Sequence, residues 1–112
     1  MKSFIAIIFL LVSACPLIAG QSIGYIDSII VRDSDGLVYF TLKNEVIETA
    51  KPACATKTYW MIRDENSKTA EYQISQLLAA QMAGKKVTIY GHGACTRWGD
   101  GEDVNTVRVY AQ

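Results

Sequence analysis

The sequence predicts a mainly β domain with a single helix, in the order strand, strand, strand, helix, strand, strand. Three observations lead to this prediction. Apolar and polar residues alternate along several short stretches, the period changes once to that of a helix, and turn residues separate the segments. At 112 residues the chain has room for one small domain and not for two independent cores.

The first twenty residues, MKSFIAIIFLLVSACPLIAG, have the layout of a secretory signal peptide. Lys2 precedes nine apolar residues, Phe4 to Val12, and small residues then suit cleavage after Ala19 or Gly20. Nine apolar residues are too few to span a bilayer as a helix. We therefore expect a leader at 1–20 and one folded domain at 21–112, in a secreted or periplasmic protein.

A second interpretation of the leader stays open. The letters VSAC (12–15) resemble a lipobox, which would make Cys15 the lipidated first residue of a membrane-anchored protein. The leader would then be only fourteen residues long, which is short for this signal.

The first half of the domain is predicted to form three strands. Residues 22–33 are rich in isoleucine, and DSDG (33–36) is typical of a tight turn. Residues 37–44 alternate, which puts three apolar side chains on one face and three polar or aromatic ones on the other: Val38, Phe40 and Leu42 against Tyr39, Thr41 and Lys43. A loop follows, and residues 56–63 read as the third strand, with Tyr59, Trp60 and Ile62.

The period then changes to that of a helix over residues 68–83. One helical face collects apolar side chains: Ala70, Ile74, Leu77, Leu78 and Met82. Asn66 or Ser67 can cap the start, and Gly84 suits the position after the end.

Two more strands complete the predicted domain. Residues 85–93 alternate Val87 and Ile89 with Thr88 and Tyr90. The last strand, 104–112, points two valines inward and two larger polar residues outward: Val107 and Val109 against Arg108 and Tyr110. Five strands with one helix between the third and the fourth is the order of the OB-fold, a Greek-key barrel. A generic five-stranded α+β sandwich is the alternative.

Charge and cysteine usage limit the function classes. Without residues 1–20, which contain Lys2 and no acid, the domain has 10 basic and 11 acidic side chains. Nucleic-acid binding needs a basic excess, so DNA and RNA are not expected partners. In an oxidising compartment Cys54 and Cys95 most simply form a disulfide, which would add about 4 kcal/mol of stability in the chain-entropy model.

The segment VTIYGHGACTRWGDGED (87–103) concentrates the residues with chemistry to offer. An enzyme would use His92 as base and Cys95 as nucleophile, but no nucleophile motif is present, so we expect no catalytic activity. The acids of GDGED lack the spacing of a calcium loop, and such a turn also occurs as a solvated connection between strands. We therefore expect neither a metal site nor a cofactor.

A binding function requires fewer specialised residues than catalysis or metal binding. OB-folds bind ligands on the face of strands two and three and on the loops joining strands one to two and four to five. The predicted loop 93–103 carries Arg97 and Trp98, and an aromatic ring offers sugars an apolar stacking surface. The outward face of the second strand would complete the patch, with Tyr39, Thr41 and Lys43. Trp98 could equally cover an end of the barrel, and the outward aromatics could be buried between subunits.

Three segments resemble the B subunit of subtilase cytotoxin and its relatives among the pertussis-like AB5 toxins: YIDSIIVRDSDGLVYFTL (25–42), PACA (52–55) and QLLAAQMAGKKVTIYGHGAC (76–95). In that family a cysteine follows the second strand region, as Cys54 does here. A leucine-rich helix then runs through a glycine turn, here Gly84, into a V-x-I-Y strand.

This resemblance implies an exported OB-fold subunit that binds sialylated glycans, assembles as a homo-pentamer and accompanies a catalytic A subunit. It implies a ligand contact near the first strand, where Ser22 is the nearest match to the family's serine. Gly91 stands where the family has a sugar-contacting tyrosine. The alternative is a periplasmic or lipid-anchored OB-fold protein that binds a peptide or another envelope partner and has no toxin role.

Overall fold

The computed structural model describes residues 18–112. They form five strands and one helix: β1 (Gln21–Val31), β2 (Val38–Thr49), β3 (Trp60–Met61), α1 (Lys68–Ala83), β4 (Lys86–Gly91) and β5 (Glu102–Val109). The predicted mainly β class, the single helix and the order of elements are confirmed. The expected leader lies outside the described residues except for 18–20, and Cys15 lies outside them too.

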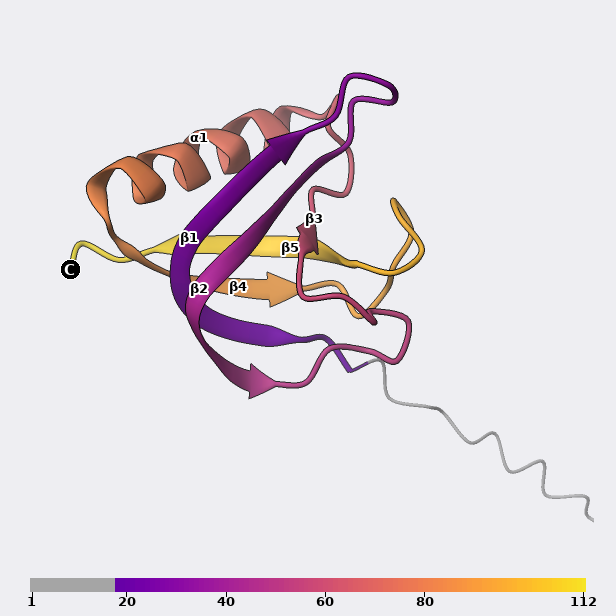
Figure 1. Ribbon diagram of the computed structural model, residues 1–112, viewed down its shortest axis with the longest axis horizontal. Coiled ribbons are helices and arrows are strands. Elements are labelled where there is room, and N and C mark those ends of the chain that lie inside the picture. The colour runs from indigo at the N-terminus through magenta and orange to yellow at the C-terminus, as the bar shows by residue number, and fades with distance from the viewer. Residues whose placement is uncertain (1–17) are drawn as a thin grey trace, which may run out of the picture.

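The five strands close into a ring in the order β1-β2-β3-β5-β4, with β4 paired back to β1 (Figure 1). Every neighbouring pair is antiparallel except β3 and β5, which are parallel. β1 takes part in two pairings, because Tyr25 lies opposite Lys43 of β2 and opposite Lys86 of β4. Register shifts along β1 and β2 accompany the strong curvature of this pair, as expected for bulged strands.

The third strand is much shorter than the predicted 56–63, since only Trp60–Met61 pairs with its neighbours. The Lys51 ammonium group explains part of this difference. It donates to the carbonyl oxygens of residues 57–59 at 3.0 to 3.5 Å, so these oxygens face a side chain instead of a strand. The same ammonium lies 4.1 Å from the centre of the Trp60 ring.

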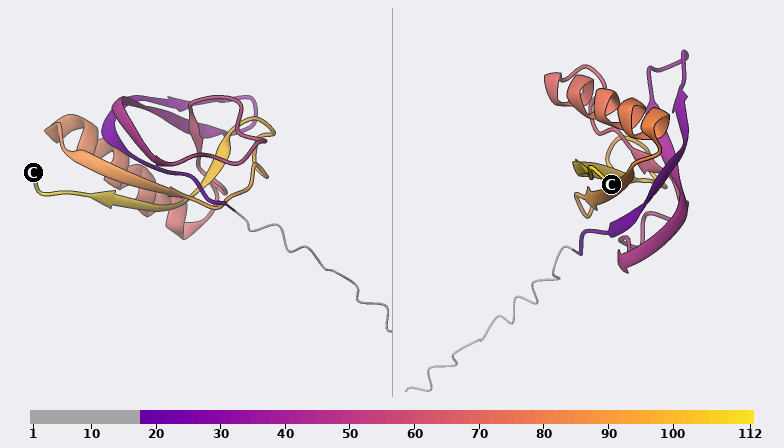
Figure 2. Two further views of the ribbon diagram at one scale, coloured as in Figure 1. Left: turned by 90° about the horizontal axis from the view of Figure 1, so that it is seen from below. Right: turned by 90° about the vertical axis from the view of Figure 1, so that its left-hand side faces the viewer.

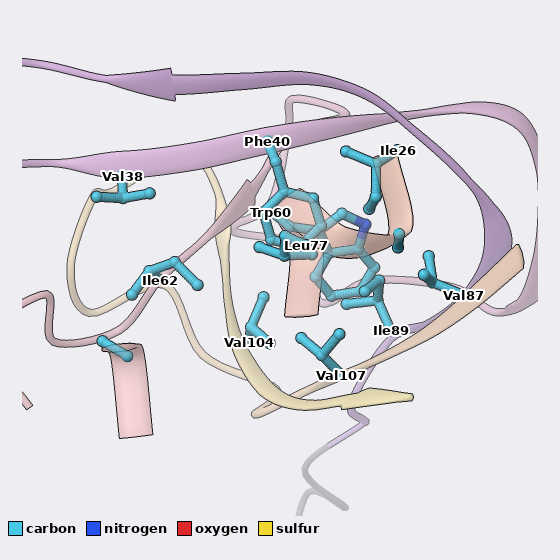
Figure 3. Packing of buried hydrophobic residues seen from close by; sticks show 12 residues of the cluster. Ile26, Val38, Phe40, Trp60, Ile62, Leu77, Val87, Ile89, Val104 and Val107 are labelled. Atoms are coloured by element: carbon cyan, nitrogen blue, oxygen red, sulfur yellow. The ribbon is translucent and has the colours of Figure 1, made fainter. Parts of the chain in front are cut away.

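Side chains from every strand and from the helix meet inside the ring (Figure 3). Trp60 and Phe40 are the largest fully buried ones. Burial of such an apolar side chain stabilises the fold by roughly 1.5–3 kcal/mol. The cluster consists of Ile26, Val38, Phe40, Trp60, Ile62, Ala70, Leu77, Ala80, Val87, Ile89, Val104 and Val107.

The helix begins and ends where the sequence predicts. The Ser67 hydroxyl accepts a hydrogen bond from the Ala70 N–H at 3.1 Å and so caps the first turn. Gly84 has a φ of 63° and ends the helix in the left-handed conformation that suits glycine. α1 packs beside the ring against β1 and β5 (Figures 1 and 2).

The predicted apolar face of the helix is only partly right. Leu77 is fully buried, but Leu78 is 47% exposed and Met82 is 86% exposed. The buried stripe instead includes Gln73 and Ala80. The Gln73 amide donates to the backbone oxygen of Asn105 at 2.9 Å, so a polar side chain can occupy this face.

One expectation for β4 is also wrong. Thr88 was expected to point outward with Tyr90, yet it is only 1% exposed. The Thr88 hydroxyl has a partner in this position, because it lies 2.9 Å from the Tyr110 hydroxyl. The Arg108 guanidinium lies 4.7 Å from the centre of the Tyr110 ring.

Candidate functional site

The β4–β5 loop, residues 92–101, is fixed from two sides. The predicted disulfide is confirmed, because Cys54 of the β2–β3 loop is bonded to Cys95. The carboxylate of Asp103, at the start of β5, accepts hydrogen bonds from the backbone N–H groups of Thr96 at 3.1 Å and Arg97 at 3.2 Å, and from the Thr96 hydroxyl. The loop is therefore anchored at Cys95, Thr96 and Arg97.

The acids of GDGED are not a solvated turn, which corrects that interpretation. Glu102 and Asp103 are both fully buried. Asp103 binds the loop backbone, and Glu102 accepts from the N–H groups of Gly20 and Gly93. Asp100 accepts a hydrogen bond from the Tyr59 hydroxyl. Each carboxylate has a structural partner, because a buried carboxylate needs hydrogen bonds to replace water.

Arg97 contacts the segment before the helix and the β1–β2 hairpin. Its guanidinium donates two hydrogen bonds of 2.9 Å to the Glu65 carboxylate and one of 3.0 Å to the backbone oxygen of Asp35. The hydrogen-bonded Glu65 raises the pKa of Arg97, and Arg97 in turn lowers the pKa of Glu65. Arg97 thus ties the β1–β2 hairpin to the β3–α1 segment and is a structural clamp.

Trp98 is 40% exposed and lies beside the β1–β2 hairpin. The Arg32 guanidinium lies 4.4 Å from the centre of its ring, which is a cation–π contact. Arg32 is itself held by Asp35, at 2.6 and 3.0 Å. The loops between β1 and β2 and between β4 and β5 therefore meet at this tryptophan.

Tyr59 links Trp98 to the second strand. The rings of Tyr39 and Tyr59 are 5.3 Å apart and meet edge to face. Burial and then the hydrogen bond to Asp100 raise the pKa of Tyr59 to about 12, and nearby Trp98 opposes part of this rise. We call Arg32, Tyr39, Tyr59 and Trp98 the aromatic patch.

Gly101 makes the position of Tyr59 achievable. A Cβ atom at residue 101 would lie 2.7 Å from the Tyr59 ring, closer than side-chain contacts allow. The absence of a side chain lets the ring lie directly on the backbone that leads into β5.

The other predicted ligand contacts lie along β2 or away from this patch. Thr41 and Lys43 continue from Tyr39 along the same strand, and the Thr41 hydroxyl accepts from the Ser28 N–H at 3.3 Å. Lys43 is exposed. Ser22 lies apart: it is 1% exposed and pairs with Ile89 and Ile47. The structure therefore brings Tyr39 and Trp98 together and leaves Ser22 elsewhere.

Two hollows adjoin the ring. One of about 740 Å³ lies between the first turn of α1 and the β4–β5 loop, and polar side chains dominate its lining: Arg63, Asp64, Ser67, Gln73, His92, Thr96, Arg97 and Asn105. The other, about 270 Å³, is lined in part by Ser22, Ile47 and Lys51. Val46 and Ile47, beside it on β2, are 62% and 66% exposed. Sequence reasoning missed Tyr59, Arg32 and Arg63 as site residues, because the segments that meet at the aromatic patch and at the larger hollow are distant in sequence.

The described residues also bear on a cysteine nucleophile, a metal site and a membrane-spanning helix. Cys95 is oxidised in the disulfide, so it offers no thiolate beside His92. Between residues 18 and 112, no group of three or more His, Cys, Asp or Glu side chains is arranged to hold a metal ion. The helix in this part of the chain is not long and apolar enough to cross a membrane.

No family model, no curated protein and no solved structure matches this chain.

Proposed function

We propose that this chain is an exported OB-fold protein that acts by binding a glycan at the aromatic patch, without catalysis. The strand order β1-β2-β3-β5-β4 in a closed ring, with α1 between β3 and β4, supports the OB-fold assignment. The disulfide is compatible with an oxidising compartment outside the cytoplasm.

The observation that carries this proposal is the meeting of Tyr39, Tyr59 and Trp98 at one surface. They come from β2, the segment before β3 and the β4–β5 loop. OB-folds bind oligosaccharides on this face and with these loops. Aromatic rings stack on the apolar faces of sugars, while Arg32 and the more distant Lys43 provide cations for an acidic sugar.

The resemblance to the subtilase cytotoxin B family makes the proposal more specific. In this more specific form of the proposal, the ligand is a sialylated glycan, the chain forms a pentamer, and a catalytic A subunit is the partner. The binding function does not depend on the assembly, so the two are tested separately.

The test is a glycan array with sialylated and matched unsialylated glycans, followed by calorimetry on the best ligand. Trp98→Ala should weaken binding about tenfold, equivalent to ~1.4 kcal/mol, because it removes a stacking surface. Tyr72→Ala is the matched control, since Tyr72 is a 66% exposed aromatic residue on the helix. Equal effects of the two variants, or no glycan binding, would reject the proposal.

A second pair of variants locates the ligand. Lys43→Ala and Arg63→Ala each remove one exposed cation, the first on the strand of Tyr39 and the second at the larger hollow. A loss of sialoglycan binding only with Arg63→Ala would move the site to that hollow.

The exposed side chains of Val46 and Ile47 favour a second candidate function, the binding of a protein partner. This corresponds to the periplasmic or lipid-anchored protein with a peptide or envelope partner. A monomer without glycan binding that captures an envelope peptide through Ile47 would support it. The mass of the native protein in solution distinguishes this monomer from a ring.

A further inference from the structure

The carboxylate of Glu102 has an unusual set of partners. Its side chain is fully buried at the start of β5. The Gly20 N–H lies within hydrogen-bond distance of both carboxylate oxygens, 3.2 Å from Oε1 and 3.0 Å from Oε2. Oε2 also accepts a hydrogen bond from the Gly93 N–H at 2.8 Å. Within residues 18–112, no lysine, arginine or histidine side chain forms an ion pair with this carboxylate within 4.0 Å. Lys51 is the cation that acts on it from farther away: burial lowers the pKa of Lys51, and the charges of Glu45 and Glu102 oppose that change.

The Glu102 carboxylate leaves no room for a side chain at Gly20 or Gly91. A Cβ atom at Gly20 would lie 2.4 Å from one Glu102 oxygen, and a Cβ atom at Gly91 would lie 1.7 Å from the other. The Gly20 oxygen accepts from the Gly91 N–H at 2.8 Å. Gly20 is thus held through both its nitrogen and its oxygen, and its nitrogen points at the carboxylate.

A buried carboxylate without a cation in direct contact is costly, because backbone N–H groups and the more distant Lys51 offset only part of the lost hydration. A full positive charge at one of the donor atoms would compensate it much better. The Gly20 nitrogen is the one donor that a chemical change of the chain can convert into a cation.

That change is cleavage of the Ala19–Gly20 bond. Ile18 and Ala19 are exposed, whereas Gly20 is buried. Hydrolysis by a signal peptidase adds the hydroxyl of water to the Ala19 carbonyl carbon and breaks its bond to the Gly20 nitrogen. The nitrogen leaves as an amine with the remaining proton of water and takes a further proton from solvent at neutral pH.

We propose that the Ala19–Gly20 bond is the processing site of this chain, and that the new α-ammonium group of Gly20 forms a buried ion pair with Glu102. Processing thereby supplies a counter-charge in direct contact with Glu102, where β1 meets the β4–β5 loop. Cleavage takes place on the translocating, unfolded chain, so the later burial of Gly20 does not hinder it. The inference depends on the proposed export and not on the proposed ligand.

Competing processing sites predict different contacts. Cleavage after Gly20 would remove the Gly20 nitrogen and leave Glu102 with one fewer donor. A lipidated Cys15 would leave the Gly20 nitrogen as an uncharged amide. Only cleavage after Ala19 places an ammonium group 3.0 to 3.2 Å from both carboxylate oxygens.

The first experiment is the intact mass of the product exported from a bacterium that expresses the full precursor. A chain beginning at Gly20 supports the proposal. A chain beginning at Gln21, at a lipidated Cys15 or at Met1 overturns it. This result is independent of glycan binding, so failure of either proposal is recognised separately.

The second experiment measures the reaction of the α-amine with an amine-selective succinimidyl ester, followed by peptide mass spectrometry. An ion pair that raises the amine pKa by one unit lowers its reactive neutral fraction about tenfold at pH 7. We expect native exported protein to react at Gly20 at least about tenfold more slowly than in urea. Reaction at equal rates would overturn the ion pair.

The variant Glu102→Gln separates the ion pair from mere burial. With the carboxylate removed, labelling should recover about tenfold, whereas Glu71→Gln on the exposed face of α1 should leave it slow. An amine that stays equally slow in Glu102→Gln contradicts the proposal. If this variant does not fold, the pH profile of native labelling decides: a midpoint above the usual ~8 supports the ion pair, and one at or below it refutes it.

Discussion

The Tyr59 hydroxyl donates a hydrogen bond to the carboxylate of Asp100, and this contact joins the segment before β3 to the β4–β5 loop. The sequence does not indicate that these two residues meet. Their contact positions the ring that connects Tyr39 to Trp98, and it makes the aromatic patch one surface instead of two.

This contact can be measured by titrating the tyrosines through their absorbance near 295 nm. Because the pKa of Tyr59 is about 12, one tyrosine should ionise well above the ordinary value of 10.0. Asp100→Asn should lower that pKa, since it removes the negative charge beside the hydroxyl, and Tyr59→Phe should remove the step. A titration curve that Tyr59→Phe leaves unchanged would contradict this assignment.

The same pKa predicts how stability changes in alkali. Neutral Tyr59 is favoured in the folded state, so its contribution is fully present below pH 10 and is lost as the pH rises toward 12. Tyr59→Phe should therefore lose less stability than the wild type over that range, as measured by urea unfolding.

Acid should loosen the β1–β2 hairpin. The hydrogen-bonded Arg32 lowers the pKa of Asp35 to about 2, against an ordinary 3.8. Because the folded-state value is the lower one, the stabilisation is present above pH 3.8 and is lost as the pH falls through 2. Asp35→Asn and Arg32→Gln should each flatten the fall of the urea midpoint between pH 4 and 2, and a fall as steep as in the wild type would contradict the pairing.

Two glycines of neighbouring segments form a matched test of packing. Gly91→Ala would place a Cβ atom 1.7 Å from a Glu102 oxygen, whereas nothing lies within 4 Å of a Cβ atom at Gly99. We expect Gly91→Ala to lower the free energy of unfolding by about 3 kcal/mol or more and Gly99→Ala to change it by less than about 0.5 kcal/mol. Equal effects in urea unfolding would mean that Glu102 can move aside at no cost.

The disulfide should contribute a large part of the stability. Cys54 and Cys95 are 41 residues apart in sequence, and a loop of that size corresponds to about 4 kcal/mol in the chain-entropy model. The double variant Cys54→Ser, Cys95→Ser should lose about that amount, and the reduced wild type should match it. A loss below about 1 kcal/mol would mean that Asp103 alone fixes the β4–β5 loop.

Hydrophobic periodicity was sufficient for the class and order of elements, because each strand and the helix must bury a face with its own spacing. The capping residues Ser67 and Gly84 were sufficient to predict where the helix begins and ends, because they act on neighbouring backbone groups. Periodicity failed for Leu78 and Met82, because only the packing against β1 and β5 decides which side of a broad apolar face is covered.

The candidate site was predictable only in part for the same reason. Alternation along β2 marked Tyr39 as outward, and the loop composition marked Trp98, but the surface between them depends on Tyr59 and Arg32.

By itself, the sequence determined a mainly β domain with one helix and a single pair of cysteines to bridge it. These features depend on residues close together in the chain or on the number of residues of a kind. Only the tertiary structure decided that Glu102 lies against Gly20 and that Asp103 binds the β4–β5 loop. An acidic turn has the same sequence pattern whether it is exposed to water or buried in the protein. Closure of the ring of strands decides whether its carboxylates are buried.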